Sequence, residues 1–295
     1  MNTNRMGAQL KLKPRLSLDD LVLISMELNS HKGKRTYIRR MSMKKNTLVA
    51  TITTALILFG SFAFVFAQQD YHDELILTYP KLKGTKIDKT CLCCHFIQEG
   101  TGPRNPYGVM YENEGTSDFA AFEKFDADGD GYTNIQEINA KTYPGDFSDS
   151  PSPKKFKKCV TFFTSKDTKT KTNITVCVVG GKKVDIAPLG GAAYEKSGTI
   201  MVPWKPVVDG LGATAVFNAK DGKGRLDVKK GSKVVAQFWV GKAKGKLNGK
   251  DYNCKVAPEL KGKNMFVSTL DLAVKTLGAT ESKITMGKIW NYNLK

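Results

Sequence analysis

The chain has 295 residues, 41% of them hydrophobic, and a formal net charge of +18 at pH 7. This length allows one large or two modest domains, and the hydrophobic content is that of globular proteins, so the composition excludes a disordered chain. The six cysteines are too few for a disulfide-dense scaffold of this length.

The first 67 residues have the pattern of a leader behind an extension. Residues 1–40 are basic and predict an upstream extension. Residues 41–67 contain Lys44 and Lys45 near their start, continue through an uncharged run and end in the small-residue pattern of a bacterial-type signal peptide. Cleavage before Gln68 would export the protein to the periplasm or the cell surface. An uncleaved anchor stays open, because residues 48–67 give about 20 residues, enough to cross a bilayer.

Removal of residues 1–67 leaves 35 Lys/Arg and 25 Asp/Glu, a net charge of +10. A basic exported protein favours anionic partners, so we expect a negatively charged redox partner protein or an acidic cell-surface component. Nucleic acid is not an expected partner, because no interleaving of aromatic and basic residues is present. A membrane is expected only through the leader, if that segment stays uncleaved.

The segment TCLCCHF, residues 90–96, holds Cys91, Cys94 and His95 at the spacing Cys-x-x-Cys-His. Two thiols one helical turn apart can each form a thioether with a haem vinyl group, while the adjacent imidazole ligates the iron. The motif resembles the attachment site of c-type cytochromes. This resemblance implies covalent haem c within residues 68–150.

Other interpretations of this cluster stay open. A structural zinc is one, although four ligands within five residues make a poor tetrahedral cage, and disulfides are another. The zinc ligands would be Cys91, Cys93, Cys94 and His95. For the sixth iron position His72 is the first candidate and Met110 the alternative, and an iron without a sixth protein ligand is the third interpretation.

Residues 126–137, DADGDGYTNIQE, match the twelve-residue EF-hand calcium loop, with oxygen donors at positions 1, 3, 5, 7, 9 and 12. The predicted ligands are Asp126, Asp128, Asp130, the Tyr132 carbonyl, Asn134 and Glu137. The alternative is a solvated acidic turn. No second complete loop is visible, so we expect one Ca²⁺ that stabilises a small haem domain, not a calcium sensor.

Residues 151–158, rich in Ser, Pro and Lys, predict a linker to a second domain at 159–295. There, short β-branched runs alternate with Gly, Lys and Asn turns, which indicates antiparallel strands, and LNGK at 247–250 predicts a tight hairpin. Two such runs contain Cys159 and Cys177. If they pair about Thr168, the cysteines lie opposite each other, so we expect a hairpin disulfide.

An internal repeat lies within this second half. Residues 198–213 and 262–279 each contain an apolar strand, ending at Pro203 or Ser268, followed by a short helix that closes in Leu-Gly-Ala. Each helix has one apolar face to bury. A twisted sheet that covers these faces is therefore expected.

The repeat pattern resembles the copper amine oxidase N-terminal-like, or stalk, domain over roughly residues 180–295. The resemblance implies a sheet wrapped on helices and no oxidase activity, because copper in such oxidases is held by histidines and this half has none. Asn291-Tyr292-Asn293 matches the quinone-forming tripeptide only superficially.

Together these patterns predict an α+β chain, with a small, mostly helical haem and EF-hand domain followed by a mainly antiparallel β domain with two short helices. We expect an exported electron carrier without catalytic activity, whose second domain serves docking or surface attachment. One alternative is a non-redox cell-surface structural or adhesion protein built on the stalk-like domain. Another is a gas-binding or peroxidase-like haem protein.

Overall fold

The computed structural model describes residues 71–113, 118–153, 155–286 and 288–295. The predicted extension at 1–40 and signal peptide at 41–67 lie outside these residues. Within the described ranges, no helix is both long enough and apolar enough to span a membrane.

Residues 71–150 fold around a small aromatic core with short helices. Residues 71–78 are helical. The further elements are η1 (Pro80–Leu82), α3 (Pro106–Asn113), η2 (Phe119–Phe122) and α4 (Asn134–Ala140). Tyr107 and Tyr111 of α3 stack on Phe119, with ring centroids 6.1 and 4.2 Å away. Most of the segment between these helices is turns, so the expectation of a mostly helical domain is wrong. Gly100, Gly102 and Pro103 are strong turn formers and keep the chain between the Cys-His turn and α3 irregular.

Fourteen strands follow in the described part of the chain, and all of them pair antiparallel, as predicted. The β1 sheet has the order β13-β14-β1-β2-β3 and comprises Thr280–Ile284, Ile289–Leu294, Lys158–Lys166, Asn173–Val179 and Lys182–Val184. The β8 sheet, β10-β9-β8-β7-β6, comprises Lys250–Asn253, Lys244–Leu247, Lys233–Trp239, Arg225–Lys230 and Thr214–Asn218. The β5 sheet, β11-β12-β5-β4, comprises Glu259–Lys261, Asn264–Ser268, Thr199–Pro203 and Tyr194–Lys196.

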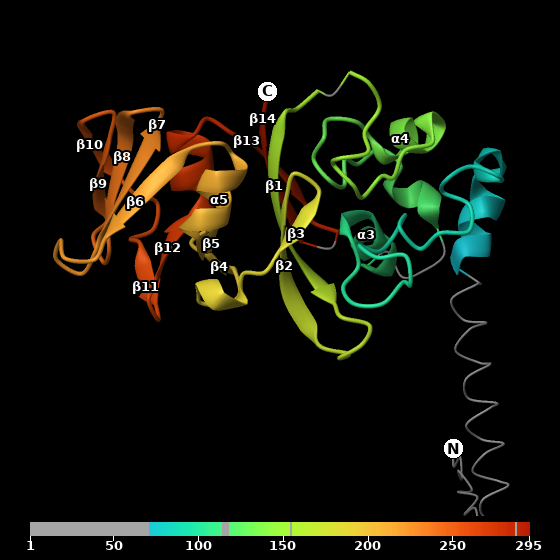
Figure 1. Ribbon diagram of the computed structural model, residues 1–295, viewed down its shortest axis with the longest axis horizontal. Coiled ribbons are helices and arrows are strands. Elements are labelled where there is room, and N and C mark those ends of the chain that lie inside the picture. Colours follow the sequence, from blue (N-terminus) through green and yellow to red (C-terminus); the bar gives the residue numbers. More distant parts are fainter. Residues whose placement is uncertain (1–70, 114–117, 154, 287) are drawn as a thin grey trace, which may run out of the picture. The chain divides into compact units, whose positions relative to one another are not determined.

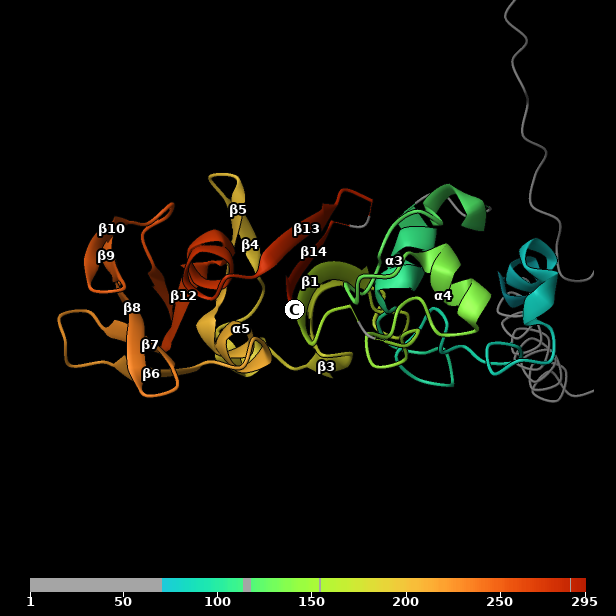
Figure 2. The ribbon, with the colours of Figure 1, turned by 90° about the horizontal axis from the view of Figure 1, so that it is seen from above.

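The internal repeat is confirmed. Strands β5 and β12 end at Pro203 and Ser268, as predicted, and they pair with each other. Helix α5 (Trp204–Gly210) follows the first strand, and a π-helical segment, η4 (Leu270–Thr276), follows the second. Both helices bury their apolar faces in one core with the β1 and β8 sheets, and α5 lies on the side of β1 away from α3 (Figures 1 and 2).

The β1 sheet is buried on both faces. Val160 and Phe162 point into the core of α5 and η4, whereas Phe163 belongs to the aromatic core of residues 71–140. Ile289 of β14 also belongs to that aromatic core. Residues 151–158 therefore do not separate two independent cores, because the N-terminal segment uses one face of the β1 sheet to complete its own core.

The register of the hairpins decides two further predictions. The LNGK hairpin is confirmed: Leu247 pairs with Lys250, and Asn248 and Gly249 take the left-handed conformation with φ of 52° and 80°. The predicted disulfide is wrong. Cys177 lies opposite Phe162, not Cys159, and both thiols are free.

The error comes from the turn between β1 and β2. Lys166 pairs with Asn173, so the chain reverses about residues 169–170 and not at Thr168. Because side chains alternate between the two faces of a sheet, this shift also places the two cysteines on opposite faces. Cys177 lies in the core with α5, while Cys159 faces Asp128.

Candidate functional sites

The predicted haem attachment segment forms a single tight turn. The N–H groups of Cys94 and His95 both donate to the Cys91 carbonyl, at 3.1 and 2.8 Å. Cys91 and Cys94 are half-buried, whereas Cys93 is 2% exposed and packs in the aromatic core. The turn thus places Cys91 and Cys94 one helical turn apart, while the Cys93 thiol is buried and hydrogen-bonded to Cys94.

Asn105 holds this turn and is not among the residues predicted from the sequence. Its side-chain amide donates to the carbonyls of Leu92 and Cys93 at 3.1 and 3.0 Å, and its own N–H donates to the Cys94 carbonyl at 3.0 Å. Asn105 is 2% exposed. The dipeptide Asn105-Pro106, a common turn signal, could have drawn attention to this position.

Helix α3 approaches the turn closely at Gly108. A Cβ at this position would lie 2.2 Å from the Cys94 carbonyl oxygen, so only glycine fits here. The Gly108 N–H donates to the Asn105 side chain at 2.9 Å. The turn at residues 91–95 and the segment 105–108 are thereby fixed to each other around the thiols.

His95 is a neutral imidazole. Burial and the nearby Arg104 guanidinium lower the pKa of His95 to about 4. Its Nδ1 is buried without a hydrogen-bond partner, and its backbone forms an isolated β-bridge with Arg104. A neutral histidine beside two accessible thiols on one turn fits the residues needed to attach haem c.

The two candidates for the sixth iron ligand contact other groups. His72 Nε2 accepts a hydrogen bond from the Lys89 N–H at 2.9 Å and lies 3.7 Å from Asp88. Met110 is fully buried in α3, with its Sδ 4.0 Å from the Asn134 side-chain amide. Both assignments stay predictions.

The acidic loop brings three carboxylates together. One oxygen each from Asp126, Asp128 and Asp130 lies within 4.8 Å of the others, and this is the only such group of His, Cys, Asp or Glu ligand atoms among the described residues. The ligand atoms of the cysteine and histidine cluster do not gather at this distance, and the alternative zinc site stays a prediction. Within the loop, Asp126 accepts hydrogen bonds from the N–H groups of Gly129 and Gly131 at 2.7 and 2.8 Å.

Glu137 on helix α4 lies near these three aspartates, although it is not part of their close group. It is fully buried, and both of its carboxylate oxygens lack a partner, as does Oδ2 of Asp128. Burial and the carboxylates of Asp128, Asp130 and Asp126 raise the pKa of Glu137. Buried acceptors without donors fit an oxygen-ligated cation such as Ca²⁺.

Asn134 has a different position from the one predicted. Its side-chain oxygen accepts from the Ala127 N–H at 3.2 Å, and its amide donates to the Phe122 carbonyl at 2.7 Å. These contacts brace the loop across its two ends, and the ligand role of Asn134 stays a prediction. The Tyr132 N–H donates to Asp130 at 2.7 Å, which orients the following peptide of the loop.

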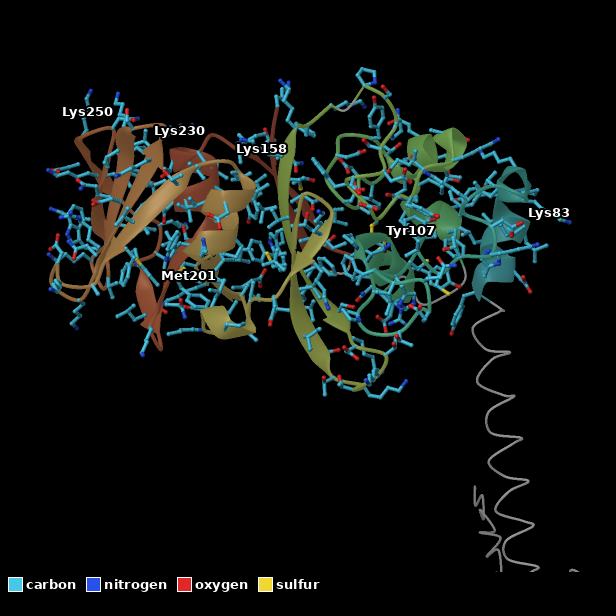
Figure 3. The ribbon with its side chains drawn as sticks, viewed as in Figure 1. Lys83, Tyr107, Lys158, Met201, Lys230 and Lys250 are labelled. Atoms are coloured by element: carbon cyan, nitrogen blue, oxygen red, sulfur yellow. The ribbon has the colours of Figure 1, made fainter. Side chains whose placement is uncertain are left out.

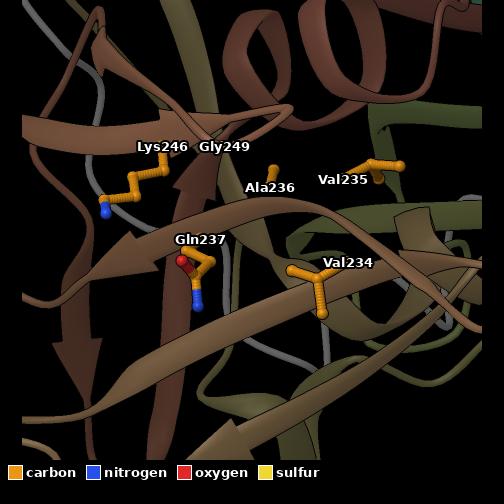
Figure 4. Close-up of a pocket in the computed structure, with 6 residues that line it drawn as sticks. All are labelled: Val234, Val235, Ala236, Gln237, Lys246 and Gly249. Atoms are coloured by element: carbon orange, nitrogen blue, oxygen red, sulfur yellow. The ribbon is translucent and has the colours of Figure 1, made fainter.

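The β8 sheet carries a shallow hollow of about 170 Å³ between β8 and β9, shown in Figure 4. Its lining residues are Val234, Val235, Ala236, Gln237, Lys246 and Gly249. Because it contains no cysteine, histidine or carboxylate, it belongs to neither candidate site.

One known protein family matches the part of the chain that contains the strand and helix repeat. Residues 178–283 match the family model of the copper amine oxidase N-terminal domain. No curated protein matches the chain, and no solved structure matches it.

The segment that matches this family model, residues 178–283, contains no histidine and is strongly basic, with 19 Lys/Arg and nine Asp/Glu. Lys230 and Lys250 are among its exposed lysines, as Figure 3 shows. Both candidate sites lie before this domain in the chain.

The acidic site predicts a pH-dependent response to calcium. Burial and the charge of Asp130 raise the pKa of Asp126 to about 6, so the calcium-free native protein holds protons near pH 5 that the unfolded chain has lost. Calcium must displace these protons. We expect the gain in Tm on adding calcium to grow from pH 5 to pH 7, measured by thermal unfolding in chelator and in calcium at each pH. Titration of His95 changes the Tm in chelator and the Tm in calcium alike, so it does not alter their difference. A gain in Tm that shrinks with rising pH would contradict the prediction.

Proposed function

We propose that this chain is an exported c-type haem protein that carries electrons. The observation that supports this best is the turn that places Cys91, Cys94 and His95 together. In this proposal Cys91 and Cys94 would hold haem c through thioethers, and the His95 imidazole would bind the iron. When bound, haem supplies a reversible one-electron redox centre.

The residues around the turn have defined roles in the proposal. Asn105 fixes the backbone of the turn, which keeps the two thiols at a constant spacing. The burial of His95 keeps its imidazole neutral and able to ligate iron. A Ca²⁺ at the acidic loop would neutralise the charge of Asp126, Asp128 and Asp130 and so stabilise the small segment that bears the haem.

The charge distribution supports separate partners for the two parts of the chain. Residues 68–150 contain seven Lys/Arg and 15 Asp/Glu, whereas residues 151–295 contain 28 Lys/Arg and ten Asp/Glu. An acidic cell-surface component would therefore bind the copper amine oxidase N-terminal domain. A redox partner that docks next to the haem would meet an acidic surface, so we propose a basic partner in place of the negatively charged one expected from the net charge of the whole mature chain.

The proposal predicts covalent haem in the mature protein. Full-length precursor produced with a cytochrome maturation system should yield a red exported protein, and intact-mass analysis under denaturing conditions should show one added haem on the polypeptide. A pyridine haemochrome spectrum measures the same quantity independently. Mature protein without added haem would overturn the proposal.

A second candidate is a non-redox surface protein in which the copper amine oxidase N-terminal domain performs the attachment. The family match over residues 178–283 and the basic charge of this domain favour it. Colourless protein that still binds cells would support this function over electron transfer. Reaction of the reduced haem protein with carbon monoxide would indicate the third function, gas binding or peroxidase-like chemistry at an open iron position.

A further inference from the structure

The back of the acidic loop lies directly on the β1 sheet. The Asn291 side-chain amide on β14 donates to the carbonyls of Asp126 and Ala127, at 3.2 and 3.4 Å. The Cys159 thiol on β1 donates to the Asp128 carbonyl at 3.3 Å. Three consecutive loop carbonyls are thus bound by residues that follow the loop far along the chain.

These donors are themselves held rigidly. Thr161 and Asn291 are register partners on the paired strands β1 and β14, and both are at most 1% exposed. The Thr161 hydroxyl lies 2.7 Å from the Asn291 side-chain oxygen and 3.4 Å from the Asp128 carbonyl. A hydroxyl has one proton, so the shorter contact takes it and fixes the Asn291 amide with its NH₂ group toward the loop.

Gly129 shows how closely the loop packs against the strands. It has φ of +83°, and a Cβ at this position would lie 2.8 Å from both the Asn293 side-chain oxygen and the Cys159 sulfur. Any larger residue would push the loop away from β1 and β14. The acidic loop is therefore packed against β1 and β14 without space for a side chain at Gly129.

We propose that Asn291 and Thr161 are positioning residues of the cation site, so that calcium binding and the docking of the loop on the β1 sheet form one linked equilibrium. The inference rests on the calcium binding contained in the proposed function. Its physical basis is that the peptide groups from Asp126 to Asp128 carry the side chains that bind the ion. Removal of a residue that orients metal ligands in this way typically lowers the metal affinity by about 10–100-fold.

The linkage works in both directions. An ion that binds only the docked loop stabilises the docked state by the free energy of its binding. Calcium would thereby hold residues 71–149 on the sheet that continues into the copper amine oxidase N-terminal domain. A loop held by the sheet would also bind the ion more tightly, because less backbone freedom is lost.

The experiment uses the mature chain, residues 68–295, after chelator treatment, and titrates calcium alone by calorimetry. Asn291→Ala and Thr161→Val should each weaken calcium binding about 10-fold. Thr161→Ser keeps the hydroxyl and should restore binding to within twofold of the wild type. Exposed residues of the β8 sheet provide the controls, Asn253→Ala and Thr214→Val, which should leave the affinity unchanged.

A second measurement does not depend on variants. Amide hydrogen exchange of the wild type should become at least about 10-fold slower in β14 on addition of calcium, because opening of the docked loop then costs the binding free energy. Gly129→Ala should lose this protection. Gly84→Ala is its control, since Gly84 has a similar φ of +78° but open space where a Cβ would lie.

The outcomes separate the two proposals. If the wild type binds no calcium, both the calcium part of the proposed function and this inference are overturned. If it binds calcium while Asn291→Ala and Thr161→Val bind equally well, or while exchange in β14 does not change, only the coupling is overturned.

Discussion

Glutamine in place of Glu137 is expected to stabilise the calcium-free protein and to destabilise the calcium-loaded one. Without calcium, Glu137 is a fully buried carboxyl group whose two oxygens have no partner and which faces three aspartates. Whether it stays charged or takes up a proton, this environment reduces the free energy of unfolding. An amide of the same shape removes the charge and this cost.

The free energy of unfolding of the calcium-free protein should rise by about 1–3 kcal/mol, which is the cost of an unsatisfied buried polar group. In a chain of this size each kcal/mol corresponds to roughly 2–4 °C in Tm. With calcium the sign reverses, because the amide cannot bind the ion bidentately. The calcium affinity should fall by more than about 100-fold, which is a larger loss than removal of a residue that only orients the ligands would cause.

Thermal unfolding of both proteins in chelator and in millimolar calcium measures this crossover. Glu99→Gln, at an exposed position before the loop, is the control and should shift neither Tm. A Glu137→Gln protein whose Tm moves in the same direction in both solutions would show that no cation occupies the acidic site.

Patterns within short stretches of the sequence predicted the structure well. The hairpin at 247–250 and the ends of β5 and β12 at Pro203 and Ser268 follow from local turn and strand signals, and the structure confirms them. The approach of Asp126, Asp128 and Asp130 likewise follows from their alternate positions in one loop. Such features depend on backbone preferences within about a dozen residues.

Features that depend on contacts between distant segments were not predicted. The predicted disulfide is wrong because the actual register differs by three residues, which changes both the partner and the face of Cys177. Asn105 was missed because its partners lie 12 and 13 residues earlier in the chain, and nothing in the local pattern indicates them.

Asn291 is the clearest case of this limit. In the sequence it is part of a tripeptide that is only superficially similar to a quinone-forming site. In the structure its amide contacts the acidic loop from a position 165 residues downstream. The side chain is fully buried because β14 lies beside β1, a pairing that no short sequence window contains.

The second large effect is expected from the cysteines of the turn. The double variant Cys91→Ala/Cys94→Ala should lose covalent haem completely, because no thiol at the attachment spacing remains. Each single variant should retain at most one thioether, which lowers the yield of haem-bearing protein and shifts the pyridine haemochrome band. Cys93→Ala is the matched control at the position between them.

Cys93 lies in the same turn but points into the aromatic core, where it is 2% exposed. Cys93→Ala should therefore keep the full haem content and lose only some stability, as expected for a small cavity in a packed core. Denaturing mass spectrometry and haemochrome spectra of the exported proteins measure haem content, and calcium binding serves as the check that each variant is folded. If Cys93→Ala loses haem as completely as the double variant does, all three thiols act together in one cluster, and attachment through Cys91 and Cys94 alone is wrong.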